Sequence, residues 1–421
     1  MDLKSLAHAR NLDQKDNLAT FKKDFHIPKN GEKDVIYLCG NSLGLQPKST
    51  ASYIEEELKN WAEKGVEGHF TGEKPWLRYH QLFDDPLSEL IGAQRNEVVC
   101  MNSLTVNIHL LMVSFYKPKN NRTKILIEAD CFPSDRYAIA SQIEWHGLDP
   151  KEHIIEIKSE DYYLDSDRVK EIIQTHKNEL ALVWLGGVNY FSGQVLDMKT
   201  ISDKAHEVGA YVGFDLAHAI GNIPLYLHNW NVDFATWCSY KYLNSGAGGV
   251  SGIYVHERYS KDENIKKLAG WWGTTEESRF QMKKTFEPIP SAESWQLSNA
   301  PILSMAAHKA SLDLFEKAGL DNIFEKSKKL TAYLNFLLED LEQENKLKII
   351  TPKERGCQLS ILVYGKDQGF IFELKERGVI LDWRKPKDSN EEYGVMRVAP
   401  VQLYNSFEQV WEFVQTLTEL L

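Results

Sequence analysis

Five short apolar runs that alternate with helical patterns constrain the fold of this chain more than any other feature. The runs are KILIEAD (124–130), HIIEIK (153–158), LALVWLGG (180–187), AYVGFDL (210–216) and VDFATWC (232–238). Helical patterns at 167–177 and 198–208 lie between them. Strands that alternate with helices predict a mostly parallel sheet covered by helices, which is an α/β fold.

The pattern changes after about residue 300. A long helical region at 302–344 leads to the apolar runs QLSILVYG and VMRVAP and to a final amphipathic helix. These features predict a smaller α/β domain at 301–421, beside a large domain at 71–300. We expect the N-terminal segment, 1–70, to pack with the small domain.

Charge and composition indicate which kinds of binding partner are expected. The chain has 421 residues, 43% of them hydrophobic, and a formal net charge of −11. An acidic chain without a long basic run is not expected to bind nucleic acid or an anionic membrane surface. We therefore expect a small-molecule substrate.

The cysteines and the N-terminus indicate the compartment. Five cysteines are scattered without a CxxC pair, which favours neither a disulfide framework nor a zinc site, and we predict no metal. The N-terminal sequence is charged and lacks an apolar signal core, and no run is long enough to span a membrane. These features predict a cytoplasmic protein.

Two segments carry residues suited to one kind of cofactor chemistry. Asp215 ends the apolar run YVGFD and is followed by His218, and Lys241 follows Phe234 and Trp237 and precedes a glycine-rich loop. An amine in an apolar setting is a good nucleophile, and an acid at the carboxyl end of a strand faces the ligand crevice of an open α/β sheet. Pyridoxal phosphate requires such a pair, a lysine for its Schiff base and an acid for its ring nitrogen. Taken singly, each residue fits a structural role as well, Asp215 as a helix cap.

A helix start is expected to hold the phosphate. In MNSLTVNIHLLM, Ser103 or Thr105 would lie where free amide groups attract an anion, although Ser103 could simply cap the helix. Tyr240, beside Lys241, could add a hydroxyl. Phe132 and Asp135 follow the run that ends at Asp130, where an aromatic ring could stack on the cofactor.

Several separate motifs carry a resemblance to one family. In chain order they are CGNSLGLQPK, GHFTGEKPW, MNSLTVNIHLLM, FPSD, FDLAHAIGN, SYKYLNSGAGG, GWWG, SNAPIL and MRVAPVQLYNSF. On these motifs the chain resembles kynureninases, fold-type I pyridoxal phosphate enzymes of tryptophan catabolism, over nearly its whole length. The resemblance implies a homodimer that hydrolyses the Cβ–Cγ bond of 3-hydroxykynurenine or kynurenine, giving an anthranilate and alanine.

The resemblance also implies roles for residues. Lys241 would be the Schiff-base lysine, Asp215 a catalytic residue at the ring nitrogen, and Tyr240 a phosphate contact. Its adjacency to Lys241, and not the resemblance, makes Tyr240 a candidate catalytic residue for later proton transfers. The implied cofactor contacts are Leu104, Thr105, Phe132, Pro133, Ser134, Asp135, Asp215, His218, Tyr240, Lys241, Trp272 and Asn299. The implied substrate contacts are Ser42, His69, Ser298, Asn299 and Arg397, with Arg397 on the carboxylate. Trp272 and Asn299 would act across the dimer interface.

Two details bear on selectivity. His69, Ser298 and Asn299 match the branch of the family that favours the 3-hydroxylated substrate, whereas His69 alone would be taken for a surface histidine. Gly186 stands where relatives tend to have a small hydroxyl residue, so one hydrogen bond to the cofactor is expected to be lost or made by water.

Other functions fit the sequence less well. Gly40-Asn41-Ser42-Leu43-Gly44 matches the nucleophile elbow of serine hydrolases, with Asp215 and His218 in the right order, but no central strand precedes it and a proline follows soon after. A cysteine desulfurase or class V aminotransferase would share the Asp, His and Lys arrangement. The GWWG, SNAPIL and RVAPVQLYNSF segments favour kynureninase. A non-catalytic module is disfavoured because Asp215, Lys241 and Arg397 are all present.

Overall fold

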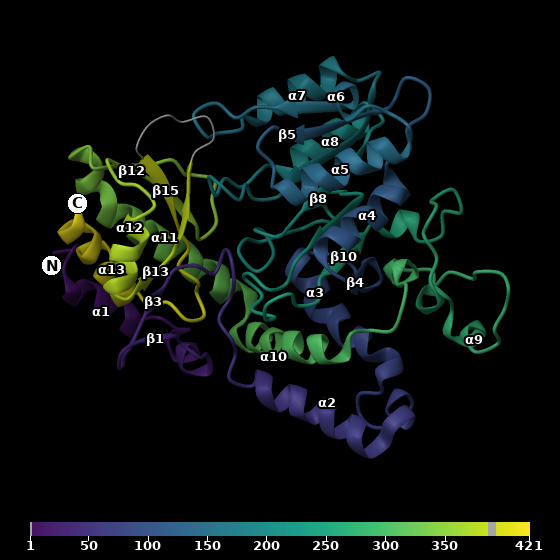
Figure 1. Ribbon diagram of the computed structural model, residues 1–421, viewed down its shortest axis with the longest axis horizontal. Coiled ribbons are helices and arrows are strands. Elements are labelled where there is room, and N and C mark those ends of the chain that lie inside the picture. Colours follow the sequence, from purple (N-terminus) through teal and green to yellow (C-terminus); the bar gives the residue numbers. More distant parts are fainter. Residues whose placement is uncertain (1, 386–392) are drawn as a thin grey trace.

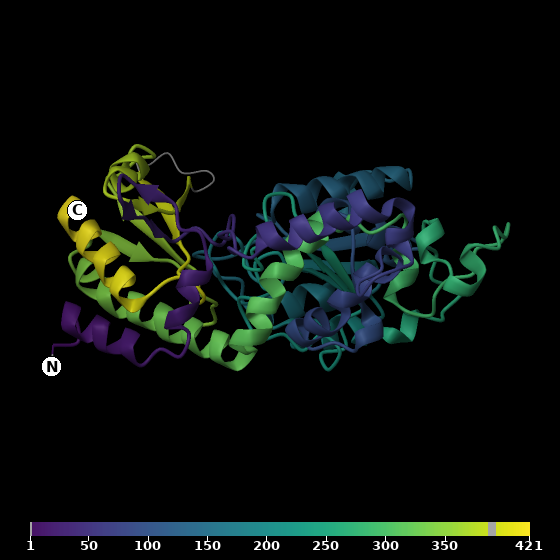
Figure 2. The same ribbon diagram turned by 90° about the horizontal axis from the view of Figure 1, so that it is seen from below.

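The computed structural model describes residues 2–385 and 393–421 and contains two α/β units side by side along its long axis (Figures 1 and 2). The large unit surrounds a seven-stranded sheet and the small unit a four-stranded one. The N- and C-terminal ends both lie at the small unit.

The large sheet is mostly parallel, as the sequence predicted. Its strand order is β4-β10-β9-β8-β7-β5-β6, and β10 runs opposite to the other six strands. The strands are β4 (Val98–Cys100), β5 (Lys124–Glu128), β6 (Ile154–Ile157), β7 (Leu180–Gly186), β8 (Tyr211–Asp215), β9 (Phe234–Trp237) and β10 (Gly252–Val255). The five expected runs form β5 to β9, whereas β4 and β10 were not predicted.

Strand β7 shows why a continuous apolar run forms the centre of this sheet. Its residues Leu182 and Trp184 pack in the cluster that contains α4 and α5, while Val183 and Leu185 pack with α7 and α8. Because successive side chains point to opposite faces, a strand covered by helices on both sides must be apolar throughout.

Helices cover both faces of the large sheet. They are α3 (Asp84–Ile91), α4 (Leu104–Phe115), α5 (Pro133–Trp145), α6 (Pro150–His153), α7 (Ser166–Thr175), α8 (Met198–Glu207) and α10 (Ile302–Ala318). Helix α9 (Glu276–Arg279) lies on an arm that extends away from the sheet (Figure 1). Short 3-10 helices occupy Ala19–Asp24, Gly65–His69, Trp76–Phe83, Arg95–Glu97, Glu257–Tyr259, Trp271–Gly273 and Ala292–Trp295.

The small unit is α/β but its sheet is antiparallel. The order is β11-β12-β15-β14, and a separate pair joins β13 to β3 near the N-terminus. The elements are β11 (Leu347–Ile349), β12 (Leu359–Tyr364), β13 (Val379–Ile380), β14 (Asp382–Arg384), β15 (Tyr393–Val398), α11 (Leu320–Gln343), α12 (Phe370–Glu376) and α13 (Phe407–Leu420). The expected helix at 302–344 is broken at Gly319, whose φ of +77° ends α10.

The N-terminal segment contacts both units. It forms α1 (Leu6–Gln14), β1 (Lys29–Asn30), β2 (Lys33–Asp34), β3 (Ile36–Tyr37) and α2 (Thr50–Lys64). The Asp13 carboxylate accepts the first two backbone N–H groups of α13, over 2.7 and 2.9 Å. Helix α2 packs along α10. The boundaries at 70 and 300 stay a prediction.

None of the described helices combines the length and the apolar character that crossing a lipid bilayer requires.

Candidate active site

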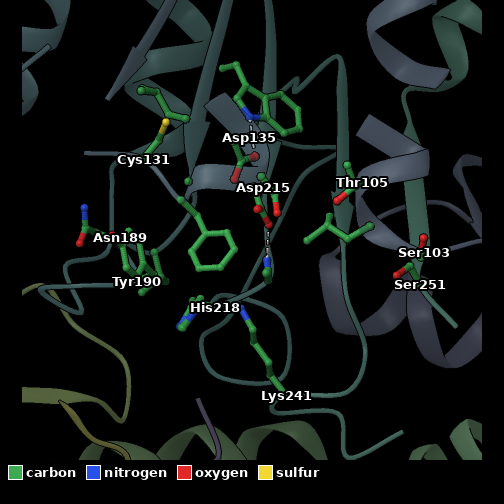
Figure 3. A pocket seen from close by; sticks show the side chains of 18 of the residues that line it. Ser103, Thr105, Cys131, Asp135, Asn189, Tyr190, Asp215, His218, Lys241 and Ser251 are labelled. Atoms are coloured by element: carbon green, nitrogen blue, oxygen red, sulfur yellow. Dashed lines mark hydrogen bonds between the residues drawn. The ribbon is translucent and has the colours of Figure 1, made fainter. Parts of the chain in front are cut away.

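A cavity opens at the carboxyl ends of the central parallel strands. The last residues of three of them line it: Glu128 of β5, Gly186 of β7 and Asp215 of β8. The N-terminus of α4 and the loop that carries Lys241 complete its wall (Figure 3). This is the edge at which open α/β sheets bind ligands.

Lys241 lies against a buried histidine. Its Nζ is 2.9 Å from Nε2 of His218 and 5.7 Å from the centre of the Phe132 ring. Burial, and next the charge of Lys241, hold the pKa of His218 well below its usual range, so the neutral ring accepts a hydrogen bond from the amine. Nδ1 of His218 is buried without a protein partner among the described residues.

Two of the aromatic residues that precede Lys241, Phe234 and Trp237, belong to strand β9. Phe234 lies inside strand β9 and its ring stacks on Phe115 in the core, with ring centres 4.4 Å apart. Since side chains alternate along a strand, aromatic residues that precede a loop need not face the loop's residues. Phe132, the N-cap residue of α5, provides an aromatic neighbour for the Lys241 amine.

Two carboxylates meet at the base of the cavity. Asp215 and Asp135 share a hydrogen bond, and Asp135 also accepts from Nε1 of Trp184 over 2.8 Å. Burial, and next the charge of Asp215, raise the pKa of Asp135 well above its usual value. Burial also raises the pKa of Asp215, while Lys241 opposes that rise. Two buried carboxylates need a proton or a cationic N–H between them. Asp215 also accepts from the backbone N–H of Ala217 over 2.7 Å, so it stabilises the following turn as well.

The opposite side of the cavity is suited to an anion. Ser103 is the N-cap residue of α4 but makes no side-chain capping bond, and Leu104 and Thr105 form the first turn. Figure 3 shows Ser103, Thr105 and Ser251 together on this side. Oγ of Ser251 is buried without a partner among the described residues. Free amide groups, the helix dipole and unused hydroxyls together favour a phosphate.

Most of the other predicted cofactor residues also reach the cavity. Phe132, Ser134 and Tyr240 line it, and burial raises the pKa of the Tyr240 hydroxyl. Pro133 occupies the first turn of α5 between two lining residues. These positions fit pyridoxal phosphate: an anion cradle, a paired acid at the far end and an amine between them.

Ser42 and Arg397 lie beside the cavity. Nη1 of Arg397 donates to the Tyr190 carbonyl over 2.7 Å, and Nη2 donates to Ser42 Oγ over 3.3 Å. Tyr190 lines the cavity, so the guanidinium lies just behind its wall. Burial lowers the pKa of Arg397.

Four residues predicted to contact the cofactor or the substrate lie outside the cavity. Nδ2 of Asn299 is 3.4 Å from Nε2 of His69, and Ser298 and Asn299 are exposed. Trp272 is buried under the guanidinium of Arg279, which is 4.6 Å from its ring centre. None of the four lines the cavity that contains Lys241, as far as the described residues show.

Sequence reasoning missed several lining residues. Glu128 is fully buried at the end of β5, accepts from Nδ2 of Asn189 over 2.9 Å, and burial raises its pKa to about 7. The rule that singled out Asp215, an acid that ends an apolar run, applies equally to Glu128. Asn189 and Tyr190 lie in the loop after β7, which has no distinctive pattern. At Gly186 a Cβ would lie 3.3 Å from the Val188 carbonyl oxygen, a short contact.

The geometry disfavours a serine hydrolase. Ser42 Oγ donates to Asp382 over 3.1 Å, while His218 contacts Lys241. A nucleophilic serine needs the histidine as its base, and here the two residues have other partners.

Three residues of metal-ligand type meet away from the cavity. Glu97, His228 and His256 offer ligand atoms within 4.8 Å of one another. The Glu97 oxygens already accept from the backbone N–H groups of Gln94 and Glu257, each over 2.8 Å, and Nδ1 of His256 accepts from the N–H of Arg258 over 3.2 Å. Hydrogen bonds therefore account for this cluster.

Comparison with solved structures identifies the fold. A cysteine desulfurase from Thermococcus onnurineus NA1 superposes with a TM-score of 0.77 at 20% identity, over 95% of this chain and 97% of that one. A mutant of C-DES, with glycine covalently linked to its PLP cofactor, gives a TM-score of 0.74 at 16% identity, over 92% of this chain and 97% of that one.

Sequence comparison places the chain in two steps. The family model described as aminotransferase class-V matches residues 36–381, so fold and sequence define a class V aminotransferase-like protein. A kynureninase of Flavobacterium psychrophilum is 48% identical over 98% of this chain and 97% of its own length, and one of Myxococcus xanthus is 49% identical over 98% and 96%. The chain belongs to the kynureninase family.

Proposed function

We propose that this chain is a pyridoxal phosphate-dependent hydrolase that cleaves kynurenines. Water is added across the Cβ–Cγ bond of the substrate side chain, which gives an anthranilate and L-alanine. The observation that carries the proposal is the cavity itself, where Lys241, the Asp135–Asp215 pair and the α4 N-terminus face one another within a chain about half identical to kynureninases.

Different residues would bind different parts of the cofactor. Lys241 would hold it covalently, Asp215 its ring nitrogen, Phe132 its ring face, and the first turn of α4 with Tyr240 its phosphate. When bound, the cofactor supplies a ring that withdraws electrons from the substrate's α-carbon. Asp215 stabilises that state because its carboxylate keeps a proton on the ring nitrogen.

The protein's own groups then orient the substrate and move protons. Arg397 would bind the substrate carboxylate, which fixes the α-carbon against the Lys241 amine. Lys241, once released, is the base for the α-proton. Nε2 of neutral His218 lies 2.9 Å from that amine and can accept a hydrogen bond from it. Tyr240 is the candidate for the later proton transfers.

The proposal includes a homodimer, which an exposed aromatic surface supports. This aromatic surface comprises Phe70, Trp271 and Phe280, with exposed fractions of 53%, 44% and 49%. Phe280 contacts both other rings, with ring centres 6.0 and 5.6 Å apart. Clusters of large exposed aromatic residues mark interaction surfaces. His69 precedes Phe70 directly and contacts Asn299, so a second subunit docked here would place both residues at the interface, as their proposed cross-subunit role requires.

Two finer statements belong to the same proposal. His69, Ser298 and Asn299 would favour the 3-hydroxylated substrate, because polar groups that bind a ring hydroxyl lose a partner when it is absent. The cytoplasm is the proposed compartment, and the five cysteines, all free, suit a reducing environment. The pathway would be tryptophan breakdown, with 3-hydroxyanthranilate available for NAD synthesis.

Borohydride reduction tests the cofactor assignment. Reduction of the holoenzyme followed by peptide mass spectrometry should place the reduced cofactor on Lys241, and Lys241→Ala should show no such adduct. Lys267, whose amine lies 3.9 Å from the centre of the Trp295 ring, is a matched control for a lysine in an aromatic setting. An adduct on Lys267 or another lysine would overturn the assignment.

A further inference from the structure

One carboxylate oxygen outside the cavity gathers three donors. Oδ2 of Asp382 accepts from Ser42 Oγ and from Arg384 Nη2, each over 3.1 Å, and forms an ion pair with Nη2 of Arg397. Asp382 and Arg397 are direct cross-strand partners in the β14–β15 pair. Opposite charges at such positions attract one another.

The charges of this group leave an excess of one positive unit. Two guanidinium groups, Arg384 and Arg397, share the single carboxylate of Asp382. The side chains of Arg397, Asp382 and Arg384 are 2%, 16% and 46% exposed, so the three form a series from the interior to the surface. A buried guanidinium without a counterion is costly, and Asp382 supplies one to Arg397.

Arg397 lies just behind the cavity wall, held there through a lining residue. Its Nη1 donates to the carbonyl of Tyr190, a lining residue, and its Nε is buried without a partner among the described residues. A guanidinium that binds a carboxylate in two-point fashion uses two adjacent N–H groups. The Nη2 group that such a ligand would share with Nε is the one now paired with Asp382.

We propose that Asp382 is a resident counterion that the substrate carboxylate displaces from Arg397. On substrate binding the Asp382 side chain turns outward to Arg384, which already donates to the same oxygen, so the buried guanidinium is never left unpaired. This inference rests on the proposed role of Arg397. Asp382 is thus a specificity-determining residue. A ligand must displace Asp382 from Arg397, and only a ligand with a carboxylate can take its place as the counterion.

Two ligands of matched shape test the exchange. L-alanine carries the carboxylate and L-alaninamide does not, and calorimetry on the holoenzyme measures the dissociation constant of each. In Asp382→Asn the competing charge is gone, so we expect L-alanine to bind about tenfold more tightly, and the KM for kynurenine to fall similarly. The binding of L-alaninamide should change less than twofold.

Substitution of Arg384 provides a second test, in which the KM and the dissociation constant should change in the opposite direction. Arg384→Met removes the group that receives the displaced carboxylate, so the KM for kynurenine and the dissociation constant for L-alanine should rise severalfold. In the double variant this rise should vanish, because no carboxylate remains to be moved. Lys385→Met removes the positive charge next in the chain to Arg384 and should leave both constants unchanged.

Three results would overturn the proposal. Weaker L-alanine binding in a folded Asp382→Asn protein would make Asp382 a support for Arg397 instead of a competitor. An equal gain for L-alaninamide would show that the ligand's carboxylate is not what competes with Asp382. If the rise in KM and in the dissociation constant persists in the double variant, Arg384 attracts the ligand through its charge alone and does not receive the displaced Asp382 carboxylate. If the wild-type enzyme does not cleave kynurenine, the proposed function fails, while the two-ligand comparison still decides the role of Asp382.

Discussion

The Nζ atom of Lys241 lies 2.9 Å from Nε2 of His218, although 23 positions separate the two residues. Strand β9 lies between them in the chain and returns the backbone beside the end of β8. A neutral histidine is therefore held against the amine without competing with it for a proton.

His218 is predicted not to titrate in the working range of the enzyme. Burial and the charge of Lys241 hold its pKa well below 6.5, so its neutral form persists as the pH falls through 6.5. The acidic limb of the kcat profile should keep its midpoint in His218→Asn, even if the rate falls. A midpoint that moves by a full pH unit would show that His218 carries that proton.

Asp215 is predicted to act on the cofactor's electronics and not on its retention. Asp215→Asn cannot stabilise a protonated ring nitrogen, so kcat should fall by about a hundredfold or more. The absorbance of the bound cofactor should persist because Lys241 and the α4 cradle are unchanged. Asp203→Asn, in a surface ion pair with Lys199, is the matched control. Loss of the cofactor with kcat per bound cofactor unchanged would contradict this role.

The raised pKa of Glu128 predicts that the stability of the folded protein depends on pH. Its folded pKa of about 7 lies above the usual 4.5, so between these values the folded state holds a proton that the unfolded state has lost. Stability is therefore fully present below pH 4.5 and declines as the pH rises toward 7. Glu128→Gln should remove this decline, on the order of 3 kcal/mol, in denaturant unfolding of the apoenzyme at about pH 5 and about pH 8. Parallel losses in both proteins would refute the assignment.

His69 and Asn299 are predicted to complete the partner's site. A hybrid dimer is purified through two tags, with Lys241→Ala in one subunit and His69→Ala plus Asn299→Ala in the other. One of its two sites would have a full set of residues if these two act across the interface, so it should regain about half of the wild-type activity. A hybrid as inactive as its parents, or an active monomer in sedimentation, would exclude the cross-subunit role.

The same residues predict substrate selectivity. His69→Ala should lower kcat/KM for 3-hydroxykynurenine roughly tenfold, the value of one hydrogen bond, and that for kynurenine much less. His153, whose ring bonds the Asp149 carbonyl one turn earlier, is the matched control. Equal losses for both substrates would assign His69 to binding in general.

The sequence predicted the parts of the site that local patterns determine. Asp215 was found because it ends an apolar run, and Thr105 because it lies at the start of a helical pattern. Glu128 satisfied the first rule and was overlooked because no lysine motif drew attention to it. The pairing of Asp382 with Arg397 depends on the register of β14 against β15, which a single chain's pattern does not give. Strand β4 was missed because it is only three residues long. Strand β10 was missed because it follows β9 without an intervening helix, so the alternation of strands and helices does not mark it.

Product analysis tests the central claim most directly. The purified holoenzyme is given kynurenine and, separately, 3-hydroxykynurenine, and both L-alanine and the aromatic amine are quantified over time. We predict equal molar amounts of alanine and anthranilate or 3-hydroxyanthranilate, with no turnover in Lys241→Ala. A cofactor absorbance band without any alanine would contradict the proposed hydrolysis and assign this cavity to another reaction of the same fold.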